Sequence, residues 1–101
     1  MRAYVAGPLT YNDTATVAVR VRQADAFVAK ALELEAAGHE ALIPTLFDLA
    51  LDTPWPVAMR ECLKHLLTCD MIVMLPDWQQ SRGARLEHQV AVAIGLEVAC
   101  P

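Results

Sequence analysis

Hydrophobic and polar positions alternate along the chain in blocks that predict four strands separated by three helices. Short apolar runs closed by glycine, proline or polar residues predict strands over residues 2–6, 40–43, 70–75 and 96–99. Apolar positions recurring at helical spacing predict helices over residues 17–37, 57–67 and about 84–94. The segment between residues 45 and 56 contains prolines and is expected to be a connector with at most a helical turn.

Strands that alternate with helices favour a parallel sheet with right-handed crossovers and helices on both faces. We therefore expect a small Rossmann-like or flavodoxin-like three-layer α/β sandwich, with a parallel sheet of about four or five strands. The sequence shows no internal repeat, low-complexity tract or linker, and its 101 residues are close to the common size of one domain. Residues 1–101 are expected to form a single domain.

The first predicted helix has one apolar stripe and ends at Gly38, a residue typical of helix C-termini. The stripe consists of Val21, Ala24, Val28, Ala31 and Leu32, with Glu35 as a polar exception at its end. The residues expected largely on the outer surface are Arg20, Gln23, Lys30 and Glu33. This assignment predicts which side of the helix packs on the sheet.

Composition narrows the class of protein. Hydrophobic residues make up 55% and charged residues 20%, which indicates a compact globular protein. The net charge of -4, without any basic run, argues against a nucleic acid polymer as partner but leaves room for a pocket that binds one nucleotide. The sequence contains no signal peptide pattern and no apolar stretch of membrane-spanning length, so we expect a cytoplasmic protein without a membrane partner.

The cysteines and histidines do not predict a metal site. The cysteines are Cys62, Cys69 and Cys100, and the histidines are His39, His65 and His88. The cysteines form no CxxC pair and their odd number suits a reducing compartment, so we expect buried thiols that act as small apolar groups. The histidines lack ligand spacing, and His65 is expected at the surface near the end of its helix. No metal and no cofactor is expected.

The expected fold places ligands at one edge of the sheet. In open parallel sheets, ligands bind outside the carboxyl ends of the strands, where the strand order reverses. That rule indicates Gly7 and Pro8 after the first strand, the segment from Pro44 onward, and residues 76–83 after the third. The last of these lies within LPDWQQSRGARLE, residues 75–87.

Glu87 is the strongest catalytic candidate in this stretch. We expect it in the first turn of the third helix, where the helix dipole favours a carboxylate. That dipole is sufficient reason for an acidic residue there, but it would also keep a carboxylate nucleophile ionised. Ser81 and Gly83 precede the helix, and they are either an N-terminal cap and a close backbone approach, or contacts to a phosphate.

Three other residues have both a structural and a functional interpretation. Trp78 either stacks on a base or sugar or covers the sheet edge. The Tyr4 hydroxyl needs a partner if buried, and a carboxylate near the strand ends could be that partner. Asp77 is the candidate general acid, with Asp48 and Asp52 as alternates, whereas Asp70 is expected to cap or to pair with a backbone group.

The sequence resembles the nucleoside 2-deoxyribosyltransferase-like proteins, and most of all their largely phage-associated DUF4406-type subgroup. The segments that carry the resemblance are AYVAGPL at the start and CDMIVMLPDW, SRGARLE and AIG in the second half, so that it extends over essentially the whole chain. The resemblance implies cleavage or transfer at the N-glycosidic bond of a (deoxy)nucleoside or nucleoside monophosphate.

Site roles follow from the matching positions. The resemblance implies that Glu87 is the nucleophile that forms a covalent deoxyribosyl-enzyme, and that Tyr4 positions it. It also implies sugar or phosphate contacts, which correspond here to Gly7, Pro8, Ser81, Gly83 and Ala84.

Two departures from the family pattern keep alternatives open. In the family an aspartate assists the leaving base, and the equivalent position here is about Cys62. Asp77 or Glu61 could take over the role of that aspartate. The transferases also use C-terminal residues of a neighbouring subunit, and the resemblance implies a homo-oligomer. The alternative to an enzyme is a non-catalytic module of the same fold that binds or senses a nucleotide, and a third possibility is a structural or partner-binding protein.

Overall fold

The computed structural model describes residues 1–9, 16–47 and 53–101, and it confirms the alternation of strands and helices. The elements are β1 (Arg2–Ala6), α1 (Val17–Ala36), β2 (Glu40–Leu42), η1 (Pro44–Leu46), α2 (Trp55–Leu66), β3 (Met71–Met74), η2 (Trp78–Gln80), α3 (Arg82–Ala93) and β4 (Glu97–Ala99), where η is a 3₁₀-helix. Within these ranges, no helix is both long enough and apolar enough to cross a membrane.

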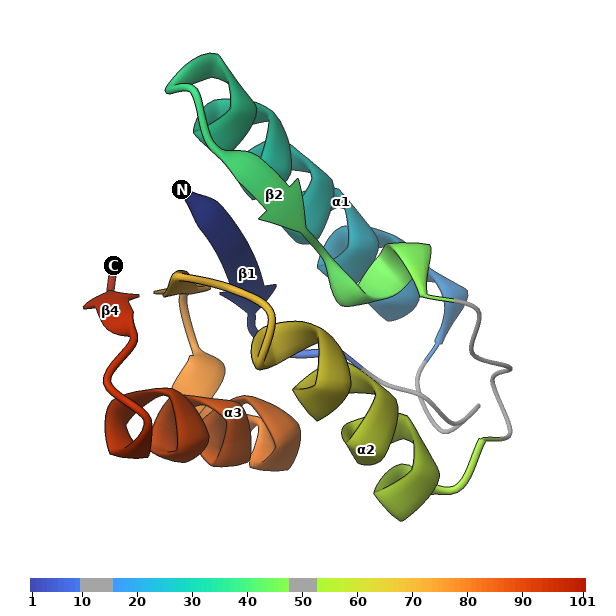
Figure 1. The fold of residues 1–101 in the computed structure, drawn as a ribbon. Coiled ribbons are helices and arrows are strands. Elements are labelled where there is room, and N and C mark those ends of the chain that lie inside the picture. Colours follow the sequence, from blue (N-terminus) through green and yellow to red (C-terminus); the bar gives the residue numbers. More distant parts are fainter. Residues whose placement is uncertain (10–15, 48–52) are drawn as a thin grey trace.

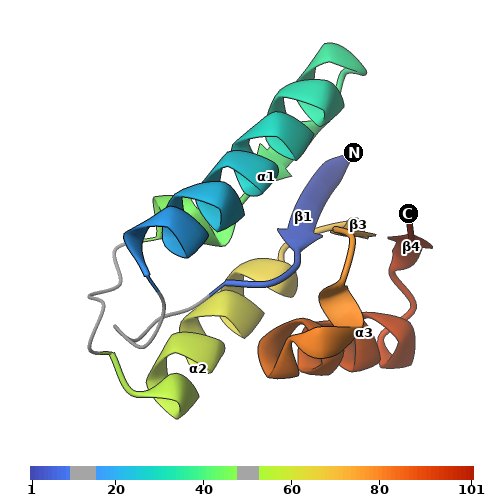
Figure 2. The ribbon, with the colours of Figure 1, turned by 180° about the vertical axis from the view of Figure 1, so that it is seen from behind.

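The four strands form one parallel sheet in the order β2-β1-β3-β4. The chain builds outward from β1 to β2 and then, in the opposite direction, from β3 to β4, so the strand order reverses between β1 and β3. Figures 1 and 2 show α1 on one side of the sheet and α2 with α3 on the other. The predicted three-layer Rossmann-like or flavodoxin-like sandwich is therefore confirmed, with four strands.

Each face of the sheet has its own core. Alternate residues of a strand point to opposite faces, so Tyr4 and Ala6 belong to one core and Val5 to the other. The core beneath α2 and α3 contains Tyr4, Ala6, Cys62, Leu66, Cys69, Ile72, Met74, Ala84 and Ala91. The core beneath α1 contains Val5, Phe27, Ala31, Ile43 and Leu75.

The prediction of which side of α1 faces the sheet is wrong except at Ala31. Phe27 and Ala31 are its buried residues, whereas Val21 and Leu32 are 51% and 62% exposed. The helix carries apolar side chains on two sides, and the spacing alone does not show which side meets the sheet. The side that meets the sheet carries Phe27, the largest apolar side chain of the helix, which is fully buried.

The second helix begins two residues before the predicted start. Trp55 and Pro56 begin its first turn, a position that proline tolerates because the first helical N–H groups have no acceptor within the helix.

The prediction that His65 lies at the surface is also wrong. His65 is half-buried, and its ring stacks on Phe47 with 3.8 Å between the ring centroids.

Candidate active site

The Tyr4 hydroxyl donates a hydrogen bond to Oε2 of Glu87. Tyr4 lies in the middle of β1 and is fully buried, and Glu87 projects from α3 with only 5% of its surface exposed. Glu87 is the one charged or polar side chain in the buried core of the described residues. The contact expected between this tyrosine and this carboxylate is present.

Burial dominates the electrostatics of the pair. It raises the pKa of Glu87 from 4.5 to about 7, because a carboxylate loses its hydration inside the protein, while the hydrogen bond from Tyr4 acts in the opposite direction. The pKa of Tyr4 is raised well above its ordinary value, first by burial and then by the neighbouring Glu87. Tyr4 is therefore a neutral donor at physiological pH, and Glu87 is poised between its acid and its carboxylate.

The expected place of Glu87 in the first turn is wrong. The helix α3 begins at Arg82, so Glu87 lies in the second turn, and there is no acidic residue in the first. The dipole effect falls off within the first turn, and burial controls the ionisation of Glu87 instead. The sequence predicted a carboxylate that the helix dipole keeps ionised. Glu87 instead titrates near neutral pH, because burial raises its pKa.

Cys62 occupies the same buried core as Tyr4. It is 1% exposed, and its thiol raises the pKa of Tyr4 both by charge and by hydrogen bonding. Cys62 is thus adjacent to the Tyr4–Glu87 pair, at the position where the resemblance implies an aspartate. Glu61, the other candidate on α2, forms a surface ion pair with Lys64 at 3.1 Å.

The residues at the start of α3 have structural roles. Ser81 is the N-cap, and its Oγ accepts a hydrogen bond from the backbone N–H of Ala84 at 3.2 Å. A Cβ atom on Gly83 would lie 3.0 Å from Sδ of Met59, so the glycine lets α3 approach α2 closely. Ala84 is buried in the core below. The capping and close-approach interpretations are both realised, and a role in phosphate binding stays a proposal.

Trp78 lies against the same helix. Its ring stacks on His88 with 4.5 Å between the centroids, and it packs against the core beneath α2 and α3. Nearby, the Arg82 guanidinium lies 3.7 Å from the centroid of the Trp55 ring. His88 therefore covers one face of the Trp78 indole.

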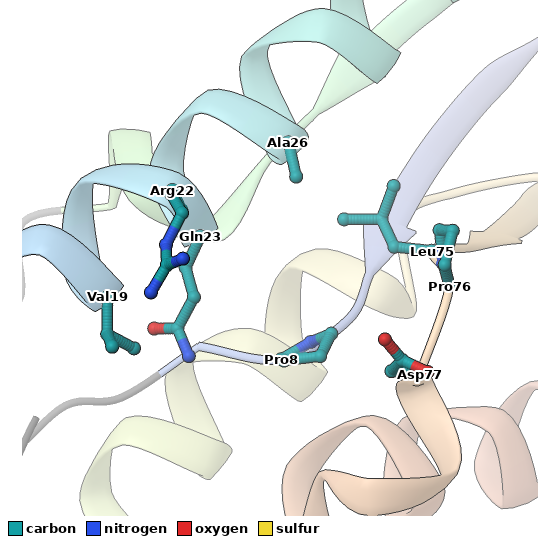
Figure 3. A pocket seen from close by; sticks show the side chains of 8 residues that line it. All are labelled: Pro8, Val19, Arg22, Gln23, Ala26, Leu75, Pro76 and Asp77. Atoms are coloured by element: carbon teal, nitrogen blue, oxygen red, sulfur yellow. The ribbon is translucent and has the colours of Figure 1, made fainter.

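A cavity of about 310 Å³ opens at the point where the strand order reverses. Its walls come from the segments after β1 and β3 and from the first half of α1, as Figure 3 shows. The lining residues are Pro8, Val19, Arg22, Gln23, Ala26, Leu75, Pro76 and Asp77. Apolar side chains make most of this wall, and Arg22 and Asp77 are the charged groups at its rim.

Two backbone features shape this cavity. A Cβ atom on Gly7 would lie only 2.7 Å from Cβ of Leu75, so the segment after β1 passes directly against the end of β3. Asp77 has a φ of 66°, the one positive φ of a non-glycine residue in the described ranges. Such backbone conformations cost free energy and are frequent at functional sites.

The sheet separates the cavity from the carboxylate. Leu75 in the cavity wall belongs to the core beneath α1, whereas Tyr4 belongs to the core beneath α2 and α3. Pro8 and Asp77 thus lie together at the cavity, on the α1 side of β1 and β3. Tyr4 and Glu87 lie together on the opposite side of these strands. A ligand that uses both groups has to cross the carboxyl edge of these strands.

Of the other aspartates, Asp70 has the structural role expected for it. Its Oδ2 accepts a hydrogen bond from the backbone N–H of Arg2 at 2.9 Å. This contact lies at the amino end of the strands, far from the carboxyl edge at which ligands were expected.

Asp48 and Asp52, the alternate candidates for the general acid, lie outside the described residues. The described ranges also contain no group of three or more His, Cys, Asp or Glu side chains that could hold a metal ion.

Phe47 and Arg22 were not among the residues that the sequence singled out. The Phe47 ring lies 6.3 Å from the Tyr4 ring, centroid to centroid, and stacks on His65. Phe47 follows β2 at the same carboxyl edge, so the edge rule could have included it. Arg22 had no such signal, because its helix position was read from the wrong apolar stripe.

Comparisons with known proteins bear on both fold and family. Residues 1–100 match the family described as a domain of unknown function, DUF4406. Among solved structures, the CMP N-glycosidase of Clostridium botulinum shares the fold with a TM-score of 0.65 at 17% sequence identity, over 99% of this chain and 70% of that one. No curated protein sequence matches the chain.

Proposed function

The chain belongs to the DUF4406 family, and we propose that it is an enzyme that cleaves or transfers at the N-glycosidic bond of a (deoxy)nucleoside or nucleoside monophosphate, with Glu87 as nucleophile. The buried hydrogen bond between Tyr4 and Glu87 carries the proposal. The fold shared with a CMP N-glycosidase supports it. Perturbed ionisable groups of this kind are typical of catalytic sites.

The first step breaks the bond between the sugar C1′ and the base nitrogen. A carboxylate oxygen of Glu87 bonds to C1′ as positive charge develops on the sugar, and the bonding electrons leave with the base, which takes up a proton. Tyr4 holds Oε2 by its hydrogen bond, which orients the carboxylate toward the sugar. The product of this step is a glycosyl ester on Glu87.

The second step regenerates the enzyme. Water attacks C1′ and breaks the ester bond, which gives free sugar or sugar phosphate and restores the carboxylate, while the proton that water loses replaces the one given to the base. A second base in place of water gives transfer. Glu87 reacts only as the carboxylate, so its pKa of about 7 sets the fraction of active enzyme near neutral pH.

The substrate is proposed to lie across the carboxyl edge of β1 and β3. Its sugar faces Glu87, and its base extends past Gly7 into the cavity, where Asp77 supplies the proton to the leaving nitrogen. Apolar walls of the cavity suit a flat heterocycle. Trp78 and the segment from Ser81 to Ala84 are the proposed contacts to sugar or phosphate.

Chromatographic detection of free base tests the activity. The protein is incubated with ribonucleosides, deoxynucleosides and their 5′-monophosphates, CMP included. We expect base release from at least one of them and its loss in Glu87→Gln, while the exposed acid variant Glu97→Gln remains active. A Glu87→Gln protein that retains the wild-type rate would refute the assigned nucleophile.

The competing function is a non-catalytic nucleotide-binding or sensing module. The separation of the cavity from Glu87 by the sheet favours it, because a ligand held in the cavity alone would not meet the carboxylate. Calorimetry with the same panel distinguishes the two. Binding without release of base from any compound would establish the module and sink the enzyme.

A further inference from the structure

Cys62 lies on the inner face of α2. The buried residues of this helix recur at helical spacing and are Ala58, Met59, Cys62 and Leu66. Cys62 is 1% exposed and belongs to the same core as Tyr4. Its helix lies beside α3, which carries Glu87 (Figures 1 and 2). A thiol, a phenol and a carboxyl group from three elements therefore come together beneath one face of the sheet.

A side-chain hydrogen bond joins Cys62 to Tyr4. The Tyr4 hydroxyl has one proton, which it donates to Oε2 of Glu87. Its oxygen can still accept a hydrogen bond, so the thiol is the donor in the bond between Cys62 and Tyr4. The three side chains thus form a chain of hydrogen bonds from Sγ of Cys62 through Oη of Tyr4 to Oε2 of Glu87.

The sulfur of Cys62 is protonated at neutral pH. An ordinary thiol ionises at about pH 8.5, and burial in an apolar core disfavours the thiolate. The charge effect by which Cys62 raises the pKa of Tyr4 belongs to alkaline pH, where the sulfur is an anion. Near pH 7 the thiol is therefore a hydrogen-bond donor.

A donor on the phenolic oxygen favours the carboxylate form of Glu87 in two ways. It polarises the Tyr4 O–H group, which strengthens the hydrogen bond from that group to Glu87. It also uses acceptor capacity of the phenolic oxygen, to which a protonated Glu87 would otherwise donate. Burial and the hydrogen bond from Tyr4 set the pKa of Glu87, so the thiol acts on the carboxyl group through Tyr4.

The other ionisable groups near Glu87 have different partners. The strand β3 consists of apolar residues. Cys69 belongs to the same core, but its thiol donates to the backbone oxygen of His65 at 3.4 Å. His88, the neighbour of Glu87 on α3, stacks on Trp78. Cys69 is thus a second buried thiol of this core whose hydrogen bond leads away from Tyr4.

We propose that Cys62 is a positioning residue, whose thiol holds the Tyr4 phenol by its oxygen and thereby keeps Glu87 oriented and ionised for attack on the sugar. The catalytic role rests on the proposed function, whereas the chain of hydrogen bonds does not. Where the resemblance implies an aspartate that assists the leaving base, this thiol acts on the nucleophile instead.

An NMR titration of Glu87, on protein with carbon-13-labelled glutamate carboxyl groups, tests the chain of hydrogen bonds without any substrate. We expect Cys62→Ala to raise the pKa of Glu87 by about 0.5 or more, because the donor is lost. Cys62→Ser keeps a donor and should restore the wild-type pKa. Cys69→Ala, the matched control, deletes a thiol from the same core and should leave the pKa unchanged. No rise in Cys62→Ala, or an equal rise in Cys69→Ala, would overturn the proposal.

A double-mutant cycle with Tyr4→Phe separates positioning from packing. Cys62→Ala leaves the same space in the core in both backgrounds, but the phenylalanine has no oxygen to hold. The effect of Cys62→Ala on the pKa of Glu87 should therefore disappear in Tyr4→Phe. An equal effect in both backgrounds would assign it to altered burial and contradict the proposed role.

Base release tests the catalytic part separately. The acid limb of the kcat/KM profile should move to higher pH in Cys62→Ala and return in Cys62→Ser. A limb that stays in place while the NMR titration shifts would refute the catalytic role of Cys62. A wild-type protein that releases no base refutes the proposed function and this role with it, but the titration still decides whether the thiol controls Glu87.

Discussion

Tyr4 in the first strand and Glu87 in the last helix form a buried hydrogen bond across 83 positions of sequence. The bond joins the centre of the sheet to α3 and holds an acidic group in the apolar core beneath α2 and α3. An ionisable side chain in such a place costs folding free energy unless it is paired. The structure pairs it with one neutral donor, which leaves its pKa near neutrality.

Replacing Tyr4 by Phe should raise the pKa of Glu87 further above 7, because the hydrogen bond that lowers it is lost while burial remains. The acid limb of the kcat/KM profile should then move to higher pH, and the rate at pH 7 should fall about tenfold or more. A pH–rate profile of both proteins measures the shift. If the limb stays in place, Tyr4 does not control the ionisation of Glu87.

Stability should depend on pH through the same carboxylate. The pKa of Glu87 is 4.5 when unfolded and about 7 when folded, so the folded state holds the proton more tightly. The free energy of unfolding is therefore greatest below pH 4.5 for this group and falls as pH rises to about 7, by an amount on the order of 3 kcal/mol.

Glu87→Gln removes this dependence because an amide does not ionise. We expect the variant to be more stable than wild type at pH 8 and similar to it near pH 4, in urea titrations at both pH values. Glu97→Gln, at an exposed position of β4, is the control and should follow the wild-type curve. Parallel curves for Glu87→Gln and wild type would show that burial does not perturb this group.

The close passage between Gly7 and Leu75 predicts a specific double-mutant result. Gly7→Ala places a methyl group 2.7 Å from Cβ of Leu75 and should destabilise the fold by about 1–3 kcal/mol. The same methyl group would lie 2.8 Å from Cδ1 and 3.1 Å from Cγ of Leu75. Leu75→Ala removes these two atoms and keeps Cβ, so the Leu75→Ala background should reduce the cost in part.

Gly38→Ala is the matched control for this pair. Gly38 has a φ of 91° and nothing within 4 Å of its Cβ position, so its cost comes from the backbone alone. The Leu75→Ala background should leave that cost unchanged in denaturant unfolding. Equal coupling of Leu75→Ala to both glycine variants would refute the steric explanation.

The cavity predicts where ligand affinity can be lost without loss of stability. Ala26→Phe fills space next to Arg22 and Pro8, and it should weaken nucleoside binding by about tenfold or more. Ala36→Phe makes the same change at the exposed end of α1, away from the cavity, and should bind as wild type. Calorimetry on both proteins measures the difference, and equal affinities would place the ligand elsewhere.

The fold could be predicted from the sequence because its strongest signals are local. The apolar run that forms β3 and the alternation of strands with helices were sufficient to predict the sandwich and the sheet edge at which the cavity opens. The packing of α1 could not be predicted in this way. Its alanines and valines give two apolar sides, and the structure buries the side with Phe27.

The contact between Tyr4 and Glu87 in the candidate site could be predicted from the sequence, but the pKa of Glu87 could not. Tyr4 and Glu87 carry motif positions, so their contact was expected, and the structure contains it. The titration of Glu87 depends on where α3 begins and how deeply the side chain is buried, neither of which a linear motif records. The stacking of His65 on Phe47 likewise depends on tertiary contacts between distant segments.

The most direct test of the central claim is peptide mass spectrometry after rapid acid quench of enzyme with a nucleoside or monophosphate in excess. We predict a glycosyl adduct on the peptide that contains Glu87, formed together with free base and absent from Glu87→Gln. Release of base by an unmodified protein, with the same rate in Glu87→Gln, would contradict the account.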